Sequence, residues 1–132
     1  MHYNNKQKIM LVDSNMMSLT MIKCLLSERY SVYALPSAYK LFEFLKHVIP
    51  DIILLDIDMP DMNGYEIITI LKADKQYADI PVIFITAKNS ESDEYEGLKL
   101  GAVDYITKPF TPALLQKRIE NHLFIRMEKK IE

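Results

Sequence analysis

Five short apolar segments, each followed by a segment with helical character, constrain the fold of this 132-residue chain more than any other feature. The short segments occupy residues 8–12, 31–35, 51–55, 81–86 and 103–106. They are too short for buried helices and therefore predict strands. Strands that alternate with helices indicate a parallel sheet, because a parallel connection needs a long crossover. We therefore expect an α/β domain, a doubly wound five-stranded parallel sheet.

Apolar residues at helical spacing mark the segments between these strands. In the first segment Met17, Met21, Cys24 and Leu25 follow Asn15, which is the predicted N-cap, and we expect Cys24 in the core. The other helices are predicted after Pro36-Ser37 and over residues 65–72, 91–100 and 111–127, with Gly101 in a left-handed conformation after the fourth helix.

Length and composition indicate one soluble domain. The formal net charge is −2 with acids and bases mixed along the chain, so electrostatics favour neither nucleic acid nor an anionic membrane surface. No apolar run is long enough to cross a bilayer. A single cysteine and the lack of an apolar secretory signal fit a reducing compartment, so we expect the cytoplasm.

The domain is expected over residues 8–125. Residues 1–7 would form an N-terminal extension, and the charged segment 126–132 would be a helical tail or a linker to an output domain. The three histidines, His2, His47 and His122, lack metal-ligand spacing and are predicted to be surface residues.

Polar residues follow or end four of the five predicted strands. Asp13 and Ser14 follow the first, Asp56 the third and Lys108 the fifth, while Thr86 ends the fourth. Each alone has an ordinary explanation, such as a turn residue, a strand end or a solvated charge. Because ligands bind at the carboxyl ends of strands in open parallel sheets, their joint occurrence predicts a site.

The chemistry of this set points to phosphoryl transfer. Clustered carboxylates need a cation, and oxygen ligands favour Mg²⁺. A carboxylate can attack a phosphoryl group to form an aspartyl-phosphate, while Lys108 and the Thr86 hydroxyl would hold the phosphoryl oxygens.

Four motifs in order resemble the receiver domains of two-component response regulators. They are Leu11-Val12-Asp13, Asp56 to Gly64 with its Met-Pro pair, Phe84 to Ala87, and Leu100 to Phe110 with its Lys-Pro-Phe sequence. The resemblance runs from about Lys8 to Leu123 and implies the flavodoxin-like receiver fold, with five strands and five helices.

The resemblance also implies roles. Asp56 would accept a phosphoryl group from a sensor histidine kinase or a phosphotransfer protein, and the domain would be a switch rather than an enzyme. Asp13, Asp56 and the Asp58 backbone carbonyl would hold Mg²⁺. Thr86 and Tyr105 would couple phosphorylation to the surface formed by the fourth helix, fifth strand and fifth helix, through which homodimers would form. A C-terminal output domain or a downstream protein would receive the signal.

One position departs from the family pattern. The family places a second acid where this chain has Ser14, a weaker metal ligand or one that acts through water. The Asp58 side chain would either compensate at the metal, or merely be solvated or pair with Lys88, and the sequence leaves these alternatives open.

Two other functions compete with the phosphoacceptor. A pseudo-receiver would keep the fold as an interaction module without phosphorylation, and Ser14 is the feature in its favour. Asp56-Ile57-Asp58 also resembles the nucleophile motif of haloacid-dehalogenase-type phosphatases, but Lys108-Pro109 stands where that family has a later acidic pair.

Overall fold

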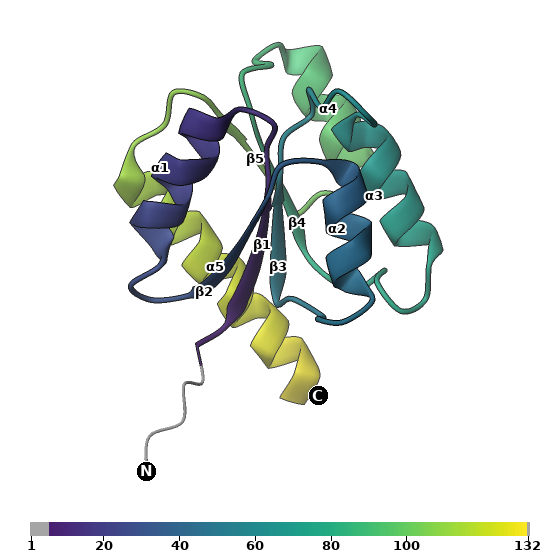
Figure 1. Cartoon of the computed structure of the whole chain (residues 1–132). Coiled ribbons are helices and arrows are strands. Elements are labelled where there is room, and N and C mark those ends of the chain that lie inside the picture. Colours follow the sequence, from purple (N-terminus) through teal and green to yellow (C-terminus); the bar gives the residue numbers. More distant parts are fainter. Residues whose placement is uncertain (1–5, 132) are drawn as a thin grey trace.

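The computed structural model describes residues 6–131 as a parallel sheet between two layers of helices (Figure 1). The strands are β1 (Lys8–Val12), β2 (Ser31–Leu35), β3 (Ile52–Leu55), β4 (Val82–Thr86) and β5 (Asp104–Thr107). The helices are α1 (Met16–Leu26), α2 (Ala38–Leu45), α3 (Gly64–Ala73), α4 (Glu91–Lys99) and α5 (Pro112–Ile131). The predicted doubly wound α/β fold is confirmed. Residues 1–5 of the predicted extension lie outside the described residues.

The strand order brings the ends of β1 and β3 together. The sheet runs β2-β1-β3-β4-β5, and all four neighbouring pairs are parallel. The winding direction reverses between β1 and β3, where Val12 pairs in register with Leu55. The residues that follow these two strands therefore share the crevice in which such sheets bind ligands.

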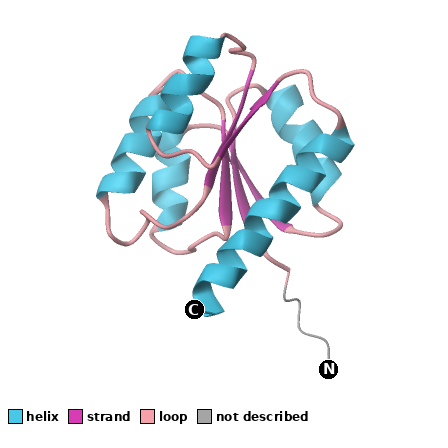
Figure 2. Ribbon diagram, turned by 180° about the vertical axis from the view of Figure 1, so that it is seen from behind, coloured by secondary structure: helices cyan, strands magenta, loops and turns pink. Residues whose placement is uncertain are grey.

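Each face of the sheet has its own hydrophobic core. Side chains alternate along a strand, so Met10 and Val12 pack on one side while Ile9 and Leu11 pack on the other. The first side is covered by α2, α3 and α4, and the second by α1 and α5 (Figures 1 and 2). Coverage of both faces explains the continuous apolar character of the strands.

Helix α1 buries a different face from the predicted one. Its buried residues are Leu19, Ile22 and Leu26, whereas Met17 and Cys24 are exposed. The expectation that Cys24 lies in the core is therefore wrong. Apolar residues surround most of α1, so its sequence contains two apolar stripes at helical spacing, and periodicity alone does not choose between them. The predicted N-cap is confirmed, because the Asn15 side chain accepts a hydrogen bond from the backbone N–H of Ser18.

Helix α5 extends past the end of the sheet (Figure 1). It continues to Ile131 rather than ending at the predicted Met127, and Arg126 donates a 2.9 Å hydrogen bond to the Asp79 carbonyl. Although α5 has 20 residues, no helix within residues 6–131 combines the length and the apolar character needed to cross a membrane.

Candidate functional site

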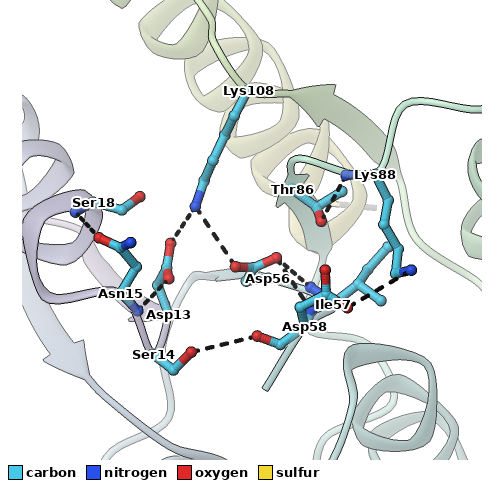
Figure 3. A network of polar contacts seen from close by, with 10 residues as sticks. All are labelled: Asp13, Ser14, Asn15, Ser18, Asp56, Ile57, Asp58, Thr86, Lys88 and Lys108. Carbon is cyan, nitrogen blue, oxygen red and sulfur yellow. Dashed lines mark hydrogen bonds and ion pairs between the residues drawn. The ribbon is translucent and has the colours of Figure 1, made fainter. Parts of the chain in front are cut away.

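The carboxyl edge of the sheet gathers the charged residues that the sequence pointed to. Asp13 follows β1, Asp56 follows β3 and Lys108 follows β5. The Lys108 Nζ lies 2.6 Å from Asp13 Oδ2 and 3.6 Å from Asp56 Oδ2. Figure 3 shows the lysine reaching down between the two carboxylates. Two carboxylates thus share one ammonium group, which leaves the cluster with an excess of negative charge.

Asp13 is the most enclosed of these groups. It is 1% exposed, and its Oδ1 accepts a 2.9 Å hydrogen bond from the backbone N–H of Asn15. Its other oxygen accepts the Lys108 hydrogen bond. Asn15 also caps α1, so the start of this helix fixes the orientation of the carboxylate.

Asp56 is held by the backbone of the loop that it begins. Its Oδ1 accepts hydrogen bonds from the N–H groups of Ile57 and Asp58, at 2.7 and 3.4 Å. Burial raises the pKa of Asp56 above its ordinary value, although the Lys108 charge and the Thr86 hydroxyl act in the opposite direction. The carboxylate is therefore short of compensating positive charge.

Thr86 and Lys88 form the wall of the site at the end of β4. Thr86 is fully buried, and its hydroxyl accepts a 3.3 Å hydrogen bond from the backbone N–H of Lys88. The Lys108 backbone N–H in turn donates to the Thr86 carbonyl at 2.8 Å. The ends of β4 and β5 thereby fix the two residues that would contact phosphoryl oxygens.

The loop after β3 meets Ser14 through its backbone. The Ser14 hydroxyl donates a 3.4 Å hydrogen bond to the Asp58 carbonyl, while Asp58 Oδ1 lies 3.7 Å from Lys88 Nζ (Figure 3). The Asp58 side chain is 67% exposed, so this ion pair is weak. The pair of Asp58 with Lys88 is thus present, and the role of the Asp58 side chain at the metal stays a prediction.

The donor atoms at this edge suit Mg²⁺. Asp13 and Asp56 supply carboxylates, Asp58 a carbonyl and Ser14 a hydroxyl, and all of these are hard oxygen ligands. Within the described part of the chain, however, no three His, Cys, Asp or Glu side chains gather closely enough to hold a metal. Mg²⁺ commonly binds through one or two carboxylates and retains several waters, so the two carboxylates of Asp13 and Asp56 are enough for this ion.

Tyr105 lies buried beside the site. It is 7% exposed, and its hydroxyl donates a 2.7 Å hydrogen bond to the Lys88 carbonyl. Its ring packs against Phe84, with 6.0 Å between the centroids. Helix α4 comes close to both rings at Gly97, where a Cβ atom would lie 2.9 Å from Phe84 and 3.2 Å from Tyr105. Thr86, Lys88 and the inner face of α4 are thus linked through one aromatic ring.

Comparison with known proteins agrees with this geometry. Residues 9–120 match the family described as response regulator receiver domain. The chain belongs to the response regulator receiver family. The resemblance seen in the four sequence motifs is therefore confirmed, as is the assignment to two-component signalling.

This receiver domain spans less than half the length of the two curated relatives described next. It is 45% identical to response regulator SaeR of Staphylococcus aureus over 102 residues, which are 77% of this chain and 43% of that protein. It is 38% identical to a probable cyclic di-GMP phosphodiesterase of Vibrio cholerae over 123 residues, 93% of this chain and 28% of the relative. The receiver domain of a Pseudomonas aeruginosa sensor histidine kinase, solved with magnesium in its active site cleft, has a TM-score of 0.82 and 28% identity, covering 89% of this chain and 98% of the other.

Two charged contacts of the receiver domain had no counterpart among the sequence predictions. His122 is a half-buried residue whose Nε2 lies 3.0 Å from Asp104 Oδ2, so the surface position predicted for it is wrong. Asp61 binds the first turn of α2. Both contacts join segments far apart in the sequence, and neither follows a motif. His2 lies outside the described residues.

Proposed function

We propose that this receiver domain accepts a phosphoryl group on Asp56 from a phosphohistidine of a sensor histidine kinase or a phosphotransfer protein, with Mg²⁺ as cofactor. The observation that carries the proposal is the pair of buried carboxylates that share Lys108 at the point where the sheet changes winding direction. A purely structural ion pair would have balanced charges, whereas this cluster has capacity for an additional cation.

Each residue would have a defined part in the transfer. A carboxylate oxygen of Asp56 attacks phosphorus, the bond from phosphorus to the donor nitrogen breaks, and its electron pair returns to the imidazole. Lys108 and the Thr86 hydroxyl then face the phosphoryl oxygens. Asp13, Asp56, the Asp58 carbonyl and, through water or weakly, Ser14 would hold Mg²⁺. When bound, the metal would neutralise negative charge on the carboxylates and the phosphoryl group.

The output of the switch would be the surface formed by α4, β5 and α5. Thr86 contacts Lys88 through its hydroxyl, and the Lys88 carbonyl accepts the Tyr105 hydroxyl hydrogen bond. A phosphoryl group that drew Thr86 toward Asp56 would disturb this chain of contacts and bias Tyr105 and α4. The proposal includes homodimers through this surface, a C-terminal output domain or a downstream protein as the reader of the signal, and a cytoplasmic location.

The pseudo-receiver is the second candidate. Ser14 replaces an acid of the family pattern, and the metal site contains only two carboxylates close to Lys108. In that case partner binding alone would set the switch, and Mg²⁺ would bind weakly or not at all.

Intact-mass spectrometry after incubation with acetyl phosphate tests the proposal. The parent and Asp56→Asn would be incubated with and without Mg²⁺. A Mg²⁺-dependent gain of one phosphoryl group by the parent, absent from the variant, is the expected result. No gain at any Mg²⁺ concentration would favour the pseudo-receiver. Steady hydrolysis of phosphate monoesters would instead favour the dehalogenase-type phosphatase.

A further inference from the structure

The loop that follows Asp56 is tied to α2 by a single acidic side chain. Asp61 Oδ1 accepts a 3.2 Å hydrogen bond from the backbone N–H of Ala38, and its Oδ2 accepts a 3.0 Å hydrogen bond from that of Tyr39. The two amides open α2 and belong to its first turn, where N–H groups lack partners within the helix. One carboxylate thus joins the loop to a helix that precedes it by more than twenty residues.

Helix α2 already has a cap of its own. The Ser37 side chain accepts a 3.1 Å hydrogen bond from the backbone N–H of Lys40, the usual arrangement for a serine N-cap. The helix therefore begins correctly without Asp61. The second contact has a different consequence, because it fixes the position of the loop relative to the rest of the domain.

The same loop supplies the carbonyl group expected to bind Mg²⁺. The loop is closed at its base by a 2.8 Å hydrogen bond from the Gly64 N–H to the Ile57 carbonyl. Met59 packs into the core, but Asp58 is exposed, and its carbonyl accepts only a long hydrogen bond from Ser14 at 3.4 Å. Asp61 therefore holds the outer part of the loop, three residues after Asp58 in the sequence.

We propose that Asp61 is a positioning residue for the metal site: by binding the first turn of α2, it keeps the Asp58 carbonyl where it meets the Ser14 hydroxyl and would bind Mg²⁺ together with Asp13 and Asp56. Asp61 touches none of the reacting groups and acts through the backbone of the loop. This inference rests on the proposed phosphoacceptor function, because it concerns the same site. Its consequence is that a residue outside the acceptor cluster sets the Mg²⁺ affinity, which matters most where Ser14 has removed one acidic ligand.

The experiment compares Asp61→Ala with Asp61→Asn and Ser37→Ala. Ser37→Ala is the matched control, because it also removes a hydrogen-bond acceptor from the first turn of α2 but leaves the loop untouched. Asp61→Asn keeps one oxygen acceptor for one of the two amides. Mg²⁺ affinity would be measured by titration of the ¹⁵N-labelled proteins without phosphodonor, and phosphoryl uptake from acetyl phosphate would be followed as a function of Mg²⁺. Thermal unfolding would report the loss of helix capping.

Asp61→Ala is expected to weaken Mg²⁺ binding about tenfold, the lower end of the range typical of residues that orient metal ligands. The Mg²⁺ concentration for half-maximal phosphoryl uptake would rise by the same factor, while the rate at saturating Mg²⁺ would change little. Asp61→Asn would recover part of the loss. Ser37→Ala would lower the melting temperature yet bind Mg²⁺ like the parent.

Two results would overturn the inference while leaving the proposed function intact. One is Mg²⁺ binding by Asp61→Ala that equals that of the parent, and the other is an equal loss in Ser37→Ala, which would reduce Asp61 to a helix cap. A parent that binds Mg²⁺ but is not phosphorylated would contradict the proposed function alone, because the titration still tests Asp61. A parent that binds no Mg²⁺ would overturn both.

Discussion

Asp56 follows the carboxyl end of β3, whereas Asp104 lies at the amino end of β5, and the two aspartates differ in how their charges are met. Their side chains are buried to similar extents, 11% and 15% exposed. Asp104 is bound by Arg118 at 2.6 Å, by His122 at 3.0 Å and by the backbone N–H of Tyr105 at 2.8 Å. Asp56 has only a share of Lys108, at 3.6 Å, besides the hydrogen bonds that it accepts from two backbone amides.

The pKa values of the two aspartates move in opposite directions. Burial raises the pKa of Asp56, and the partners of that carboxylate do not fully compensate. Burial acts in the same sense on Asp104, but hydrogen bonds from Arg118, His122 and the Tyr105 amide outweigh it and lower the pKa. A buried carboxylate with a full set of hydrogen-bond and ion-pair partners stabilises the fold, whereas one with an incomplete set is available for chemistry.

The largest expected effect follows from removal of Lys108, whose ammonium group lies between the carboxylates of Asp13 and Asp56. Lys108→Ala should reduce the initial rate of Mg²⁺-dependent phosphoryl uptake about 100-fold, because a positioned donor to the transferring oxygens is lost. The time course of intact mass with acetyl phosphate measures this rate. Lys117→Ala is the control, since Lys117 is an exposed residue of α5 that pairs with Glu120. A rate for Lys108→Ala within threefold of the parent would refute the role given to Lys108.

A third carboxylate should increase the excess of negative charge at the carboxyl edge of the sheet, which we call the acceptor edge because it carries Asp56. Ser14→Asp is expected to tighten Mg²⁺ binding about tenfold, because an ionised oxygen ligand replaces a neutral one. Without Mg²⁺ the same variant should melt at a lower temperature than the parent, since a further carboxylate would add to the negative charge that Lys108 compensates only in part. Thr20→Asp adds an equal charge at an exposed position of α1 and should change neither quantity. Unchanged Mg²⁺ affinity in Ser14→Asp would show that position 14 does not face the metal.

Neutralisation of the two aspartates should change stability in opposite directions. Near pH 7 and without Mg²⁺, Asp56→Asn removes an ionised group that is under-compensated in the folded state, and it should stabilise the protein. Asp104→Asn weakens three favourable contacts and should destabilise it. Each change is expected to be about 1 kcal/mol, or about 3 °C in melting temperature for a domain of this size. Shifts of the same sign would remove the distinction drawn between the two aspartates.

The smallest effect is the acid dependence of the Asp104 contribution. The pKa of Asp104 is lower in the folded than in the unfolded chain, so its stabilising contribution is complete above the ordinary value of 3.8 and is lost as the pH falls through the lowered value. The difference in unfolding free energy between the parent and Asp104→Asn should therefore shrink as the pH falls from about 5 toward 2. Urea unfolding at several pH values measures it, and a difference that grew below about pH 5 would contradict this assignment.

The acceptor edge could be predicted from the sequence because a parallel sheet collects the ends of its strands at one edge. Once the five strands were recognised, Asp13, Asp56, Thr86 and Lys108 had to lie close together. The acid missing at Ser14 and the alternative pair of Asp58 with Lys88 were also visible, because both depend on short offsets from a recognised motif.

The contacts of Asp104 and Asp61 could not be predicted in the same way. Asp104 shows no periodicity that would reveal His122 as its partner, because the contact depends on how α5 crosses β5. Asp61 likewise binds backbone amides, which every residue except proline carries, so no partner can be identified from residue type. In α1 the sequence contains two apolar stripes, and the shape of the sheet surface selected the one with Leu19 and Ile22 rather than the one with Met17.

Thr86, Phe84 and Tyr105 point to the same side of the sheet, the side covered by α2, α3 and α4, whereas Ile85 and Ile106 point to the side covered by α1 and α5. The side chains at the ends of β4 and β5 therefore connect the site to one of the two hydrophobic cores more directly than to the other. A disturbance that begins at the Thr86 hydroxyl reaches the α4 half directly, while the half built on α1 and α5 meets it only through an aliphatic layer. The half that contains α4 would move when the switch changes state, and the half built on α1 and α5 would stay in place.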